Sequence, residues 1–401
     1  MLRGKKIVLG ITGGIAAYKA AELTRELVRR GASVRVIMTD NATRFITPLT
    51  LETLSGNQVC TDMFARSQDF EIAHVSLADF ADLMIIAPAT ANVIGKIAAG
   101  VADDLLTTTV MATTAPVLLC PAMNNRMYEN PLVKGNIAKL AGHGYFFAEP
   151  GFGELACRSE GQGRLAEIME IIAEAETILT PKDLTGEHVL VTAGPTREPF
   201  DPVRFITNYS SGKMGYALAV MAARRGADVT LISGPASLPV PRRVKFIPVS
   251  TALEMKDAVM KLYKKSTVII KAAAVGDYRP ATPSASKIKK GAERLTVSFE
   301  KNPDIIAELG RKKGDRILVG FSMETEDLVR NARAKMLAKK MDLIVANDLT
   351  DEGAGFQSDT NAVVIITPEG QEERLPLMDK RDVADRILDR VKTIITARRR
   401  G

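Results

Sequence analysis

Three side chains in the first half of the chain are of types that take part in catalysis: an imidazole, an amide and a thiol. His74 is one of only three histidines in 401 residues. Asn124 follows the apolar run VLLCPAM, and Cys157 lies in the glycine-rich stretch GELACRSEGQGRL. Imidazole titrates near neutral pH, a buried amide needs a hydrogen-bonding partner, and free cysteines are mostly buried. From periodicity alone, a surface or capping histidine is the simpler interpretation of His74.

Hydroxyl and basic side chains in the second half suit an anionic ligand. The stretch RFITNYSSGKMG (204–215) places Ser210, Ser211 and Lys213 at the start of an expected helix. Hydroxyls and backbone N–H groups at such a start can bind an anion. The sequence lacks the P-loop pattern there, and an ordinary serine helix cap would look the same.

A second charged group follows a predicted strand. In KAAAVGDYRPATPSASKIKK (271–290) the strand ends near Asp277, and a lysine-rich stretch containing Lys287 comes next. An acidic residue followed by lysines suits a nucleotide with its metal ion, although an isolated lysine cluster is usually a solvated surface. Lys335 and Lys339 lie one helical turn apart, so both can face one ligand.

Strand and helix signals alternate through the first half, which predicts a parallel sheet covered on both faces. Strands are expected at 5–13, 33–39, 82–90, 116–123 and 144–150, and helices at 15–30 and 164–179.

The pattern restarts after a polar segment, 180–187, which we interpret as a linker. HVLVTAGPT (188–196) resembles the opening KIVLGITGG, and RRGADVTLISG (224–234) resembles RRGASVRVIMT (29–39). We therefore predict an α/β chain of two tandem doubly wound, Rossmann-like domains, 1–180 and 181–401. Further strands are expected at 244–249, 267–275, 295–300, 316–321, 342–347 and 362–367, and helices at 251–265, 303–312, 326–340 and 379–397.

Composition sets outer limits on function. The net charge of +7 suits small polyanions as well as nucleic acid, and the basic residues are dispersed apart from the C-terminal run 398–400, read as a solvated tail. Three cysteines without metal-ligand spacing predict a reducing cytoplasm, with Cys60 and Cys120 buried. No apolar run approaches the roughly 18 residues of a membrane span, and the apolar stretch at 7–11 reads as a strand, not a signal peptide.

In open α/β sheets ligands bind beyond the carboxyl ends of the strands. Four such loops in the first half are small and rich in hydroxyls and amides: 10–14, 39–41, 87–92 and 121–124. The first loop is not the dinucleotide G-x-G-x-x-G, and no acidic residue ends the second strand, so a mononucleotide fits better. A structural tight turn explains the glycines about equally well.

Three ordered motifs together resemble a known family: HVSLADFADLMIIAPATANVIGKIAAGVADDLLTTT, PAMNNRMYENP and ACRSEGQGR. They are similar to flavin-dependent cysteine decarboxylases, and more closely to the bacterial bifunctional phosphopantothenoylcysteine decarboxylase/phosphopantothenate–cysteine ligases. The similarity extends over essentially the whole chain. It implies a flavodoxin-like flavoprotein domain followed by a Rossmann-like ligase domain.

For the first domain, the resemblance implies decarboxylation of 4′-phosphopantothenoylcysteine to 4′-phosphopantetheine and CO2, through oxidation of the cysteinyl thiol by FMN. His74 would act in the oxidative half-reaction, Asn124 would hold the substrate carboxylate, and Cys157 would protonate the enethiolate during reduction. Arg158 and Ser159 depart from the residues expected after that cysteine, which leaves the contacts of this loop open. The implied FMN-binding residues are Thr12, Gly13, Gly14, Thr39, Ala89, Thr90, Asn92 and Met123.

For the second domain, the resemblance implies ligation of L-cysteine to 4′-phosphopantothenate using CTP, through an acyl-cytidylate. Asn208 and Arg204 would bind the substrate, Lys287 would stabilise charge that develops in the transfer, and Asp277 would also hold Mg²⁺. The implied CTP-binding residues are Ala273, Asp277, Lys287, Pro303, Asp304, Ile305, Ile306, Phe321, Lys335 and Lys339.

The family also implies a homo-oligomer, a dodecamer built from decarboxylase trimers and ligase dimers with the flavin at a subunit interface. We expect a cytoplasmic enzyme of coenzyme A biosynthesis that binds neither nucleic acid nor membrane. A non-catalytic flavin- or nucleotide-binding regulator, perhaps associated with DNA, is the alternative. It would account for the loops but not for His74, Asn124 and Cys157 in family order. Nothing in the residues selects CTP over ATP.

Overall fold

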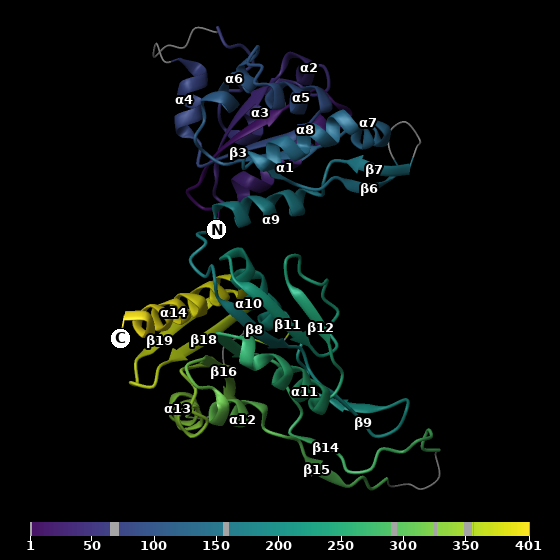
Figure 1. The fold of residues 1–401 in the computed structure, drawn as a ribbon, viewed down its shortest axis with the longest axis vertical. Helices are drawn as coiled ribbons and strands as arrows, with labels where there is room; N and C mark the ends of the chain where they lie inside the picture. The colour runs from purple at the N-terminus through teal and green to yellow at the C-terminus, as the bar shows by residue number, and fades with distance from the viewer. Residues whose placement is uncertain are drawn as a thin grey trace. The chain divides into compact units, whose positions relative to one another are not determined.

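The structure is a computed structural model that describes residues 2–64, 72–154, 160–289, 295–324, 327–348, 355 and 357–400. The chain divides into two compact units, Met1–Thr180 and Pro181–Gly401. Figure 1 shows each as a sheet with helices on its faces. No helix among the described residues is long and apolar enough to cross a membrane.

Unit 1 is built on a parallel sheet with the strand order β2-β1-β3-β4-β5. This is the flavodoxin-like order, in which the chain reverses direction across the sheet between β1 and β3. A separate antiparallel hairpin, β6-β7, follows the sheet. The strands are β1 (Lys6–Ile11), β2 (Ser33–Met38), β3 (Leu83–Ala89), β4 (Val117–Pro121), β5 (Phe146–Phe147), β6 (Gly151–Glu154) and β7 (Glu160–Arg164).

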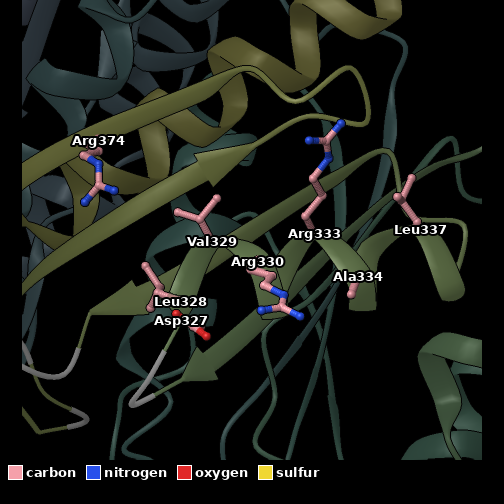
Figure 2. Close-up of a pocket in the computed structure, with 8 residues that line it drawn as sticks. All are labelled: Asp327, Leu328, Val329, Arg330, Arg333, Ala334, Leu337 and Arg374. Atoms are coloured by element: carbon pink, nitrogen blue, oxygen red, sulfur yellow. The ribbon is translucent and has the colours of Figure 1, made fainter.

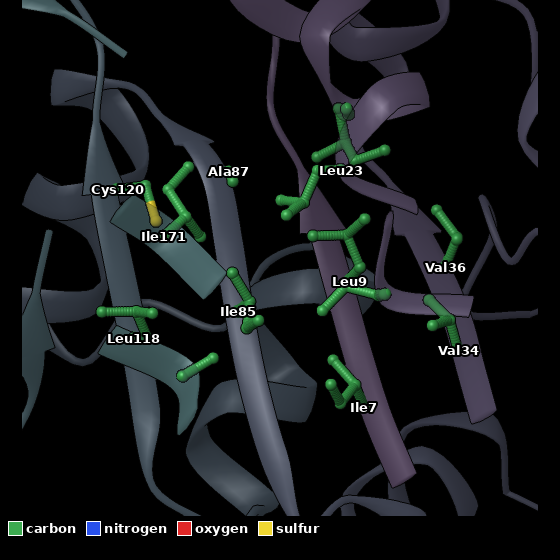
Figure 3. Packing of buried hydrophobic residues seen from close by; sticks show 14 of the residues in the cluster. Ile7, Leu9, Leu23, Val34, Val36, Ile85, Ala87, Leu118, Cys120 and Ile171 are labelled. Atoms are coloured by element: carbon green, nitrogen blue, oxygen red, sulfur yellow. The ribbon is translucent and has the colours of Figure 1, made fainter. Parts of the chain in front are cut away.

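Two apolar clusters cover the faces of this sheet, as a parallel sheet requires. Figure 3 shows Leu9 and Ile85 on neighbouring strands, with Leu23 of α1 and Ile171 of α9 packed over them. The opposite face is covered chiefly by α5, α6 and α8. The helices are η1 (Ile15–Tyr18), α1 (Lys19–Arg29), α2 (Asp40–Thr43), α3 (Pro48–Ser55), α4 (Ala73–Phe80), α5 (Ala91–Ala99), α6 (Leu105–Ala112), α7 (Asn125–Glu129), α8 (Pro131–Gly142) and α9 (Ile168–Leu179).

Unit 2 has a longer sheet with the order β12-β11-β8-β13-β16-β17-β18-β19. The pairs from β12 to β17 are parallel, whereas β17-β18 and β18-β19 are antiparallel. A short turn can join antiparallel strands, so β19 follows β18 without a crossover helix. The sheet strands are β8 (His188–Ala193), β11 (Asp228–Ser233), β12 (Lys245–Pro248), β13 (Val268–Lys271), β16 (Ile317–Glu324), β17 (Leu343–Asp348), β18 (Thr360–Ile366) and β19 (Glu372–Asp379).

The helices of unit 2 also lie on both faces of its sheet. One apolar cluster includes residues of α10 and α14, and the other includes residues of α11, α12 and α13. Two small antiparallel ribbons, β9-β10 and β14-β15, stand outside the sheet (Figure 1). Their bounds and those of the helices are β9 (Arg197–Pro199), β10 (Phe205–Thr207), β14 (Tyr278–Pro280), β15 (Phe299–Lys301), α10 (Lys213–Arg224), α11 (Ala252–Leu262), η2 (Tyr263–Lys265), α12 (Ile305–Lys312), α13 (Leu328–Ala338) and α14 (Lys380–Arg400).

Three expectations about particular segments are wrong. Within the expected linker, Leu184 is buried in the core of unit 2 and Asp183 accepts hydrogen bonds from the Arg225 guanidinium, so most of the segment is part of unit 2. The expected tail is the last turn of α14, where Arg398 pairs with Asp342. Of the strand expected at 295–300, only the end is a strand, β15. It pairs with β14 in a separate ribbon and is not part of the main sheet.

One close approach in unit 2 depends on a glycine. A Cβ built on Gly310, in α12, would lie 1.9 Å from the backbone oxygen of Lys339, directly after α13. We therefore predict that Gly310→Ala forces α12 away from α13 and lowers the free energy of unfolding of unit 2 by about 1–3 kcal/mol. Calorimetric unfolding measures this change.

The control is Gly135→Ala in α8, where the added Cβ meets no atom within 4 Å. Alanine is the better helix former, so this variant should gain about 0.5–1 kcal/mol. A Gly310→Ala protein that unfolds like the wild type would contradict the predicted contact.

Candidate active sites

A cavity of about 960 Å³ lies at the strand-end loops of unit 1. Its volume is in the range of cofactor and ligand pockets. Of the residues expected to bind FMN or the substrate carboxylate, seven line it: Gly13, Gly14, Thr39, Thr90, Asn92, Met123 and Asn124. The loops after β1, β2, β3 and β4 thus meet at one edge of the sheet, as predicted.

Two expected FMN-binding residues, Thr12 and Ala89, are not among those that line the cavity. Thr12 is fully buried, and its hydroxyl donates to the backbone oxygen of Pro88 at 2.7 Å and accepts from the backbone N–H of Thr90. Ala89 is also fully buried, and its backbone oxygen accepts from Ala122 N. Both residues therefore join neighbouring strand ends, and Thr12 fixes the loop after β1 to the loop after β3.

The glycine of the first loop is required by packing. A Cβ on Gly13 would lie 2.4 Å from the Cβ of Asn41 in α2. The loop after β1 and the start of α2 can approach this closely only because residue 13 has no side chain. That approach forms the floor of the cavity.

Asn124 caps α7. Its Oδ1 accepts from the backbone N–H of Arg126 at 2.9 Å, and the side chain is partly exposed. Because Oδ1 is bound to the backbone, the amide NH₂ is the end of the side chain suited to a carboxylate. Asn125 is the first residue of this helix, and its Nδ2 donates to Glu160 O in β7.

The hairpin strand β7 packs against the Asn124 loop. Met123 N donates to Gly163 O, and a Cβ on Gly163 would lie 2.3 Å from Met123 O. Gly163 also has φ +155°, which disfavours other residues. Cys157 lies outside the described residues, in the segment between β6 and β7.

His74 lies in the first turn of α4, and its Nδ1 is buried without a hydrogen-bond partner among the described residues. Buried polar atoms of this kind are uncommon and call for an explanation. Among the described residues, those that line the cavity around Asn124 do not include His74. Cys60 is partly buried and Cys120 fully buried, and burial raises the pKa of both thiols.

Unit 2 repeats the buried threonine arrangement. Thr192 Oγ1 in β8 accepts from the backbone N–H of Ala273, after β13, and Thr196 Oγ1 accepts from Gly276 N. The expected CTP-binding residue Ala273 is buried here. The expected metal ligand Asp277 follows directly and is exposed.

The expected substrate-binding residues Arg204 and Asn208 lie on either side of β10. Asn208 Nδ2 donates to Ala274 O at 3.1 Å. Arg204 binds the buried carboxylate of Asp201 through Nε and Nη2. Asp201 also accepts from the backbone N–H of Ile288, so it links Arg204 to the residue after the exposed Lys287. Sequence reasoning missed Asp201.

The expected nucleotide-binding charges gather around the start of α12. Asp304 caps this helix through Ala307 N, and its carboxylate forms an ion pair with Lys339 at 2.7 Å. Burial raises the pKa of Asp304, but the Lys339 hydrogen bond and the Ala307 N–H outweigh it and lower that pKa. Lys335 and Lys339 both interact with Lys271, a residue that sequence reasoning did not single out. Pro303 precedes the cap, and Ile305 and Ile306 anchor the first turn in the core.

A second cavity in unit 2, of about 160 Å³, lies at the start of α10. The predicted anion cradle Ser210–Lys213 lines it, together with Ala273 and Phe321. Ser322 also lines it, and its buried hydroxyl has no partner among the described residues. A polar atom with no partner in a cavity wall suits a polar ligand.

A third hollow, of about 630 Å³, lies along α13 and contains none of the expected site residues. Figure 2 shows Arg330 and Arg333 on α13 and Arg374 on a neighbouring strand. The lining positions occupy a different face of α13 from Lys335 and Lys339. This hollow is therefore separate from the charges expected to bind a nucleotide.

Comparisons with known proteins show the family of the chain. One family model, described as Flavoprotein, matches residues 1–179, and another, described as DNA/pantothenate metabolism flavoprotein C-terminal domain, matches 184–395. The chain is 50% identical over 398 residues to the coenzyme A biosynthesis bifunctional protein CoaBC of Bacillus subtilis, covering 98% of each chain. This chain belongs to the bifunctional coenzyme A biosynthesis family. The resemblance inferred from the motifs is confirmed.

The Escherichia coli K12 member of this family is 46% identical over 397 residues, covering 98% of each chain. A crystal structure of the C-terminal domain of a CoaBC protein is 38% identical, covers 54% of this chain and 99% of that chain, and has a TM-score of 0.47. The predicted fold class, a flavodoxin-like flavoprotein domain followed by a Rossmann-like domain, is also confirmed.

Asp201 gives a prediction about pH. The hydrogen bond from Arg204 holds the pKa of the Asp201 carboxyl well below its usual range, and three backbone N–H groups act in the same direction. A lowered folded-state pKa stabilises the protein above the unfolded value of about 3.9, and this is lost as pH falls. Asp201→Asn should therefore remove part of the acid dependence of unfolding of unit 2.

Denaturant unfolding between pH 7 and pH 3 measures this effect. The control is Asp257→Asn, at an exposed position of α11. If Asp201→Asn and Asp257→Asn keep the same acid dependence, the Asp201 carboxylate does not hold this loop as described.

Proposed function

We propose that unit 1 decarboxylates 4′-phosphopantothenoylcysteine and that unit 2 makes this compound from 4′-phosphopantothenate, L-cysteine and CTP. The observation that carries the proposal is that seven of the expected residues line one strand-end cavity in unit 1, while Asp277, Asp304, Lys335 and Lys339 surround Lys271 in unit 2. Family membership supports both activities. A regulator without catalysis would need neither the Asn124 amide at the cavity nor the charged groups at the start of α12.

In unit 1, the residues that line the large cavity would hold FMN. Gly13 and Gly14 bring backbone close to the ligand, Thr39 and Thr90 add hydroxyls at helix starts, and Met123 offers an apolar contact. Bound FMN would accept two electrons from the substrate thiol and return them in the final reduction.

The chain's own residues supply binding and proton transfer in that reaction. The Asn124 amide NH₂ holds the substrate carboxylate, which leaves as CO2 once the neighbouring carbon can delocalise charge onto sulfur. His74 moves the proton of the oxidative half-reaction, since an imidazole can both accept and donate a proton. Cys157 protonates the enethiolate, which completes 4′-phosphopantetheine.

In unit 2, CTP would lie across the start of α12. Lys335, Lys339 and the helix N-terminus bind phosphate charge, and Phe321 and Ala273 contact the nucleotide from the sheet. Asp277 is a single exposed carboxylate, and no cluster of three or more possible metal-ligating side chains occurs among the described residues. One carboxylate suits Mg²⁺ that is otherwise bound by phosphate oxygens.

The substrate would lie beside the nucleotide. Asn208, already bound to Ala274 O, presents its remaining amide atoms near the end of β13, and the cradle Ser210–Lys213 suits a phosphate. Lys287 stabilises the charge that develops as CMP leaves and the cysteine amine attacks the acyl carbon. Arg204 is placed close by through Asp201 and Ile288.

We also propose a homo-oligomer in which the flavin site is shared. Among the described residues, those that line the Asn124 cavity do not include His74 of the same chain. The buried Nδ1 of His74 also has no hydrogen-bond partner among the described residues. A neighbouring decarboxylase unit that brings its His74 to this cavity accounts for both facts. The trimer, dimer and dodecamer of the family and the cytoplasmic location remain parts of this proposal.

Subunit mixing tests the shared site and the first activity together. His74→Asn and Asn124→Ala should each abolish most CO2 release from 4′-phosphopantothenoylcysteine. Mixed oligomers of the two variants should regain CO2 release, because some interfaces then pair an intact His74 with an intact Asn124. Co-expression with two affinity tags isolates the mixed oligomers.

The control mixes His74→Asn with the double variant His74→Asn/Asn124→Ala in place of Asn124→Ala. No interface then pairs an intact His74 with an intact Asn124, so CO2 release should not recover. Mixed oligomers that stay inactive would contradict the shared site. A flavin-loaded wild type that releases no CO2 would contradict the decarboxylase function itself.

A further inference from the structure

β13 ends in Lys271, whose side chain lies on the face of the sheet that α12 and α13 cover. Its neighbours two residues away on either side, Ile269 and Ala273, belong to the apolar cluster on that face. Lys271 pairs in register with Thr192 on β8 and Gly320 on β16. Since paired residues in parallel strands share a face, the ammonium extends between a threonine and a glycine.

Gly320 lets Met341 and Ile306 pack directly against the sheet on this face. A Cβ there would lie 2.2 Å from Met341 Sδ and 2.8 Å from Ile306 Cδ1. The strand position beside Lys271 is therefore covered by the first turn of α12 and by Met341. Ile306, in that turn, follows Asp304, which caps the helix.

The charges that act on Lys271 come from α12, from α13 and its C-cap, and from the segment after β13. Asp304 at the start of α12 and Asp277 after β13 attract its ammonium, while Lys335 of α13 and Lys339 directly after it repel it. The Asp304 carboxylate is already paired with Lys339. Lys271 Nζ donates a hydrogen bond to the backbone oxygen of Ala273, which is neutral, at 3.3 Å.

An ammonium in this position is poorly compensated. Burial is the main cause that lowers the pKa of Lys271 to about 8, and the repulsion from Lys335 and Lys339 adds to it. A buried cation without a carboxylate of its own is costly, and such groups cluster at functional sites. An anionic ligand at the start of α12 would supply the missing negative charge.

We propose that Lys271 binds the polyphosphate of the nucleotide in the ligase site, together with Lys335, Lys339 and the N-terminus of α12. Lys335, Lys339 and Asp304, which caps α12, all act electrostatically on the Lys271 ammonium, and cationic side chains beside a helix N-terminus suit phosphate. The inference rests on the proposed function of unit 2. It adds Lys271, a residue of the central sheet, to the nucleotide-binding residues expected from the sequence.

Replacement by methionine tests this role in the full-length, flavin-loaded protein. Lys271→Met keeps most of the side-chain volume and removes the charge. It should weaken CTP binding about tenfold or more in titration calorimetry, the loss typical of a charge-assisted hydrogen bond. The KM for 4′-phosphopantothenate should change less than twofold, and CMP should lose less affinity than CTP.

Two further variants separate a phosphate contact from a structural role. Lys271→Arg keeps the charge and should retain more CTP affinity than Lys271→Met. Lys312→Met removes an exposed lysine that pairs with Glu308 farther along α12, and should leave CTP binding unchanged. Thermal unfolding of Lys271→Met without nucleotide should be unchanged or higher in temperature, because a poorly compensated charge is gone.

The possible results separate a failure of the Lys271 contact from a failure of the proposed ligase function of unit 2. If the wild type binds CTP and Lys271→Met binds it within twofold as tightly, Lys271 does not contact the nucleotide and the inference fails alone. An equal loss for CTP and 4′-phosphopantothenate, or a large loss of thermal stability, assigns Lys271 a structural role and also overturns it. A wild type that binds no CTP overturns the proposed function instead.

Discussion

A buried threonine hydroxyl at the end of the first strand is the constraint on which both sites depend. In unit 1, Thr12 ties the loop after β1 to Pro88 and Thr90 at the end of β3. In unit 2, Thr192 and Thr196 tie β8 and its loop to the backbone after β13. Each tie spans the pair of strands between which the sheet reverses direction, where open α/β sheets bind ligands. The ties therefore set the distance between the two loops that form each site.

The two sites use this common frame for different chemistry. The cavity of unit 1 is lined by glycines, threonines, amides and methionines, which suit a large flat cofactor and one carboxylate. The site of unit 2 is built from lysines and aspartates at the start of α12, which suit phosphates and a metal ion. A poorly compensated cation at Lys271 costs stability in the empty protein, and a bound nucleotide would restore it.

The strand-end loops could be predicted from sequence because they depend on local patterns. An apolar run that ends in glycine, threonine or asparagine predicts both the strand and the position of its loop, and seven of the expected residues line one cavity. The motifs of the resemblance also predicted the family, which the comparisons confirm.

Pairings between distant segments could not be predicted in this way. Nothing around Thr12 shows that its hydroxyl is bonded to Pro88, and nothing around Asp201 shows that it holds Ile288. Lys271 looks like the polar end of an apolar strand until α13 places two lysines beside it. The C-terminal arginines illustrate the same limit, since they look like a solvated tail in isolation and pair with Asp342 and Glu187 in the fold.

The central claim is that two separate strand-end sites in one chain carry out successive reactions. A coupled assay that follows CMP and CO2 from 4′-phosphopantothenate, L-cysteine, CTP and Mg²⁺, with Asn208→Ala and Asn124→Ala compared, tests it most directly. The account predicts that Asn208→Ala releases no CMP yet still decarboxylates supplied 4′-phosphopantothenoylcysteine, and that Asn124→Ala releases CMP and accumulates this intermediate. Loss of both activities in either variant, with folding and flavin content preserved, would contradict it.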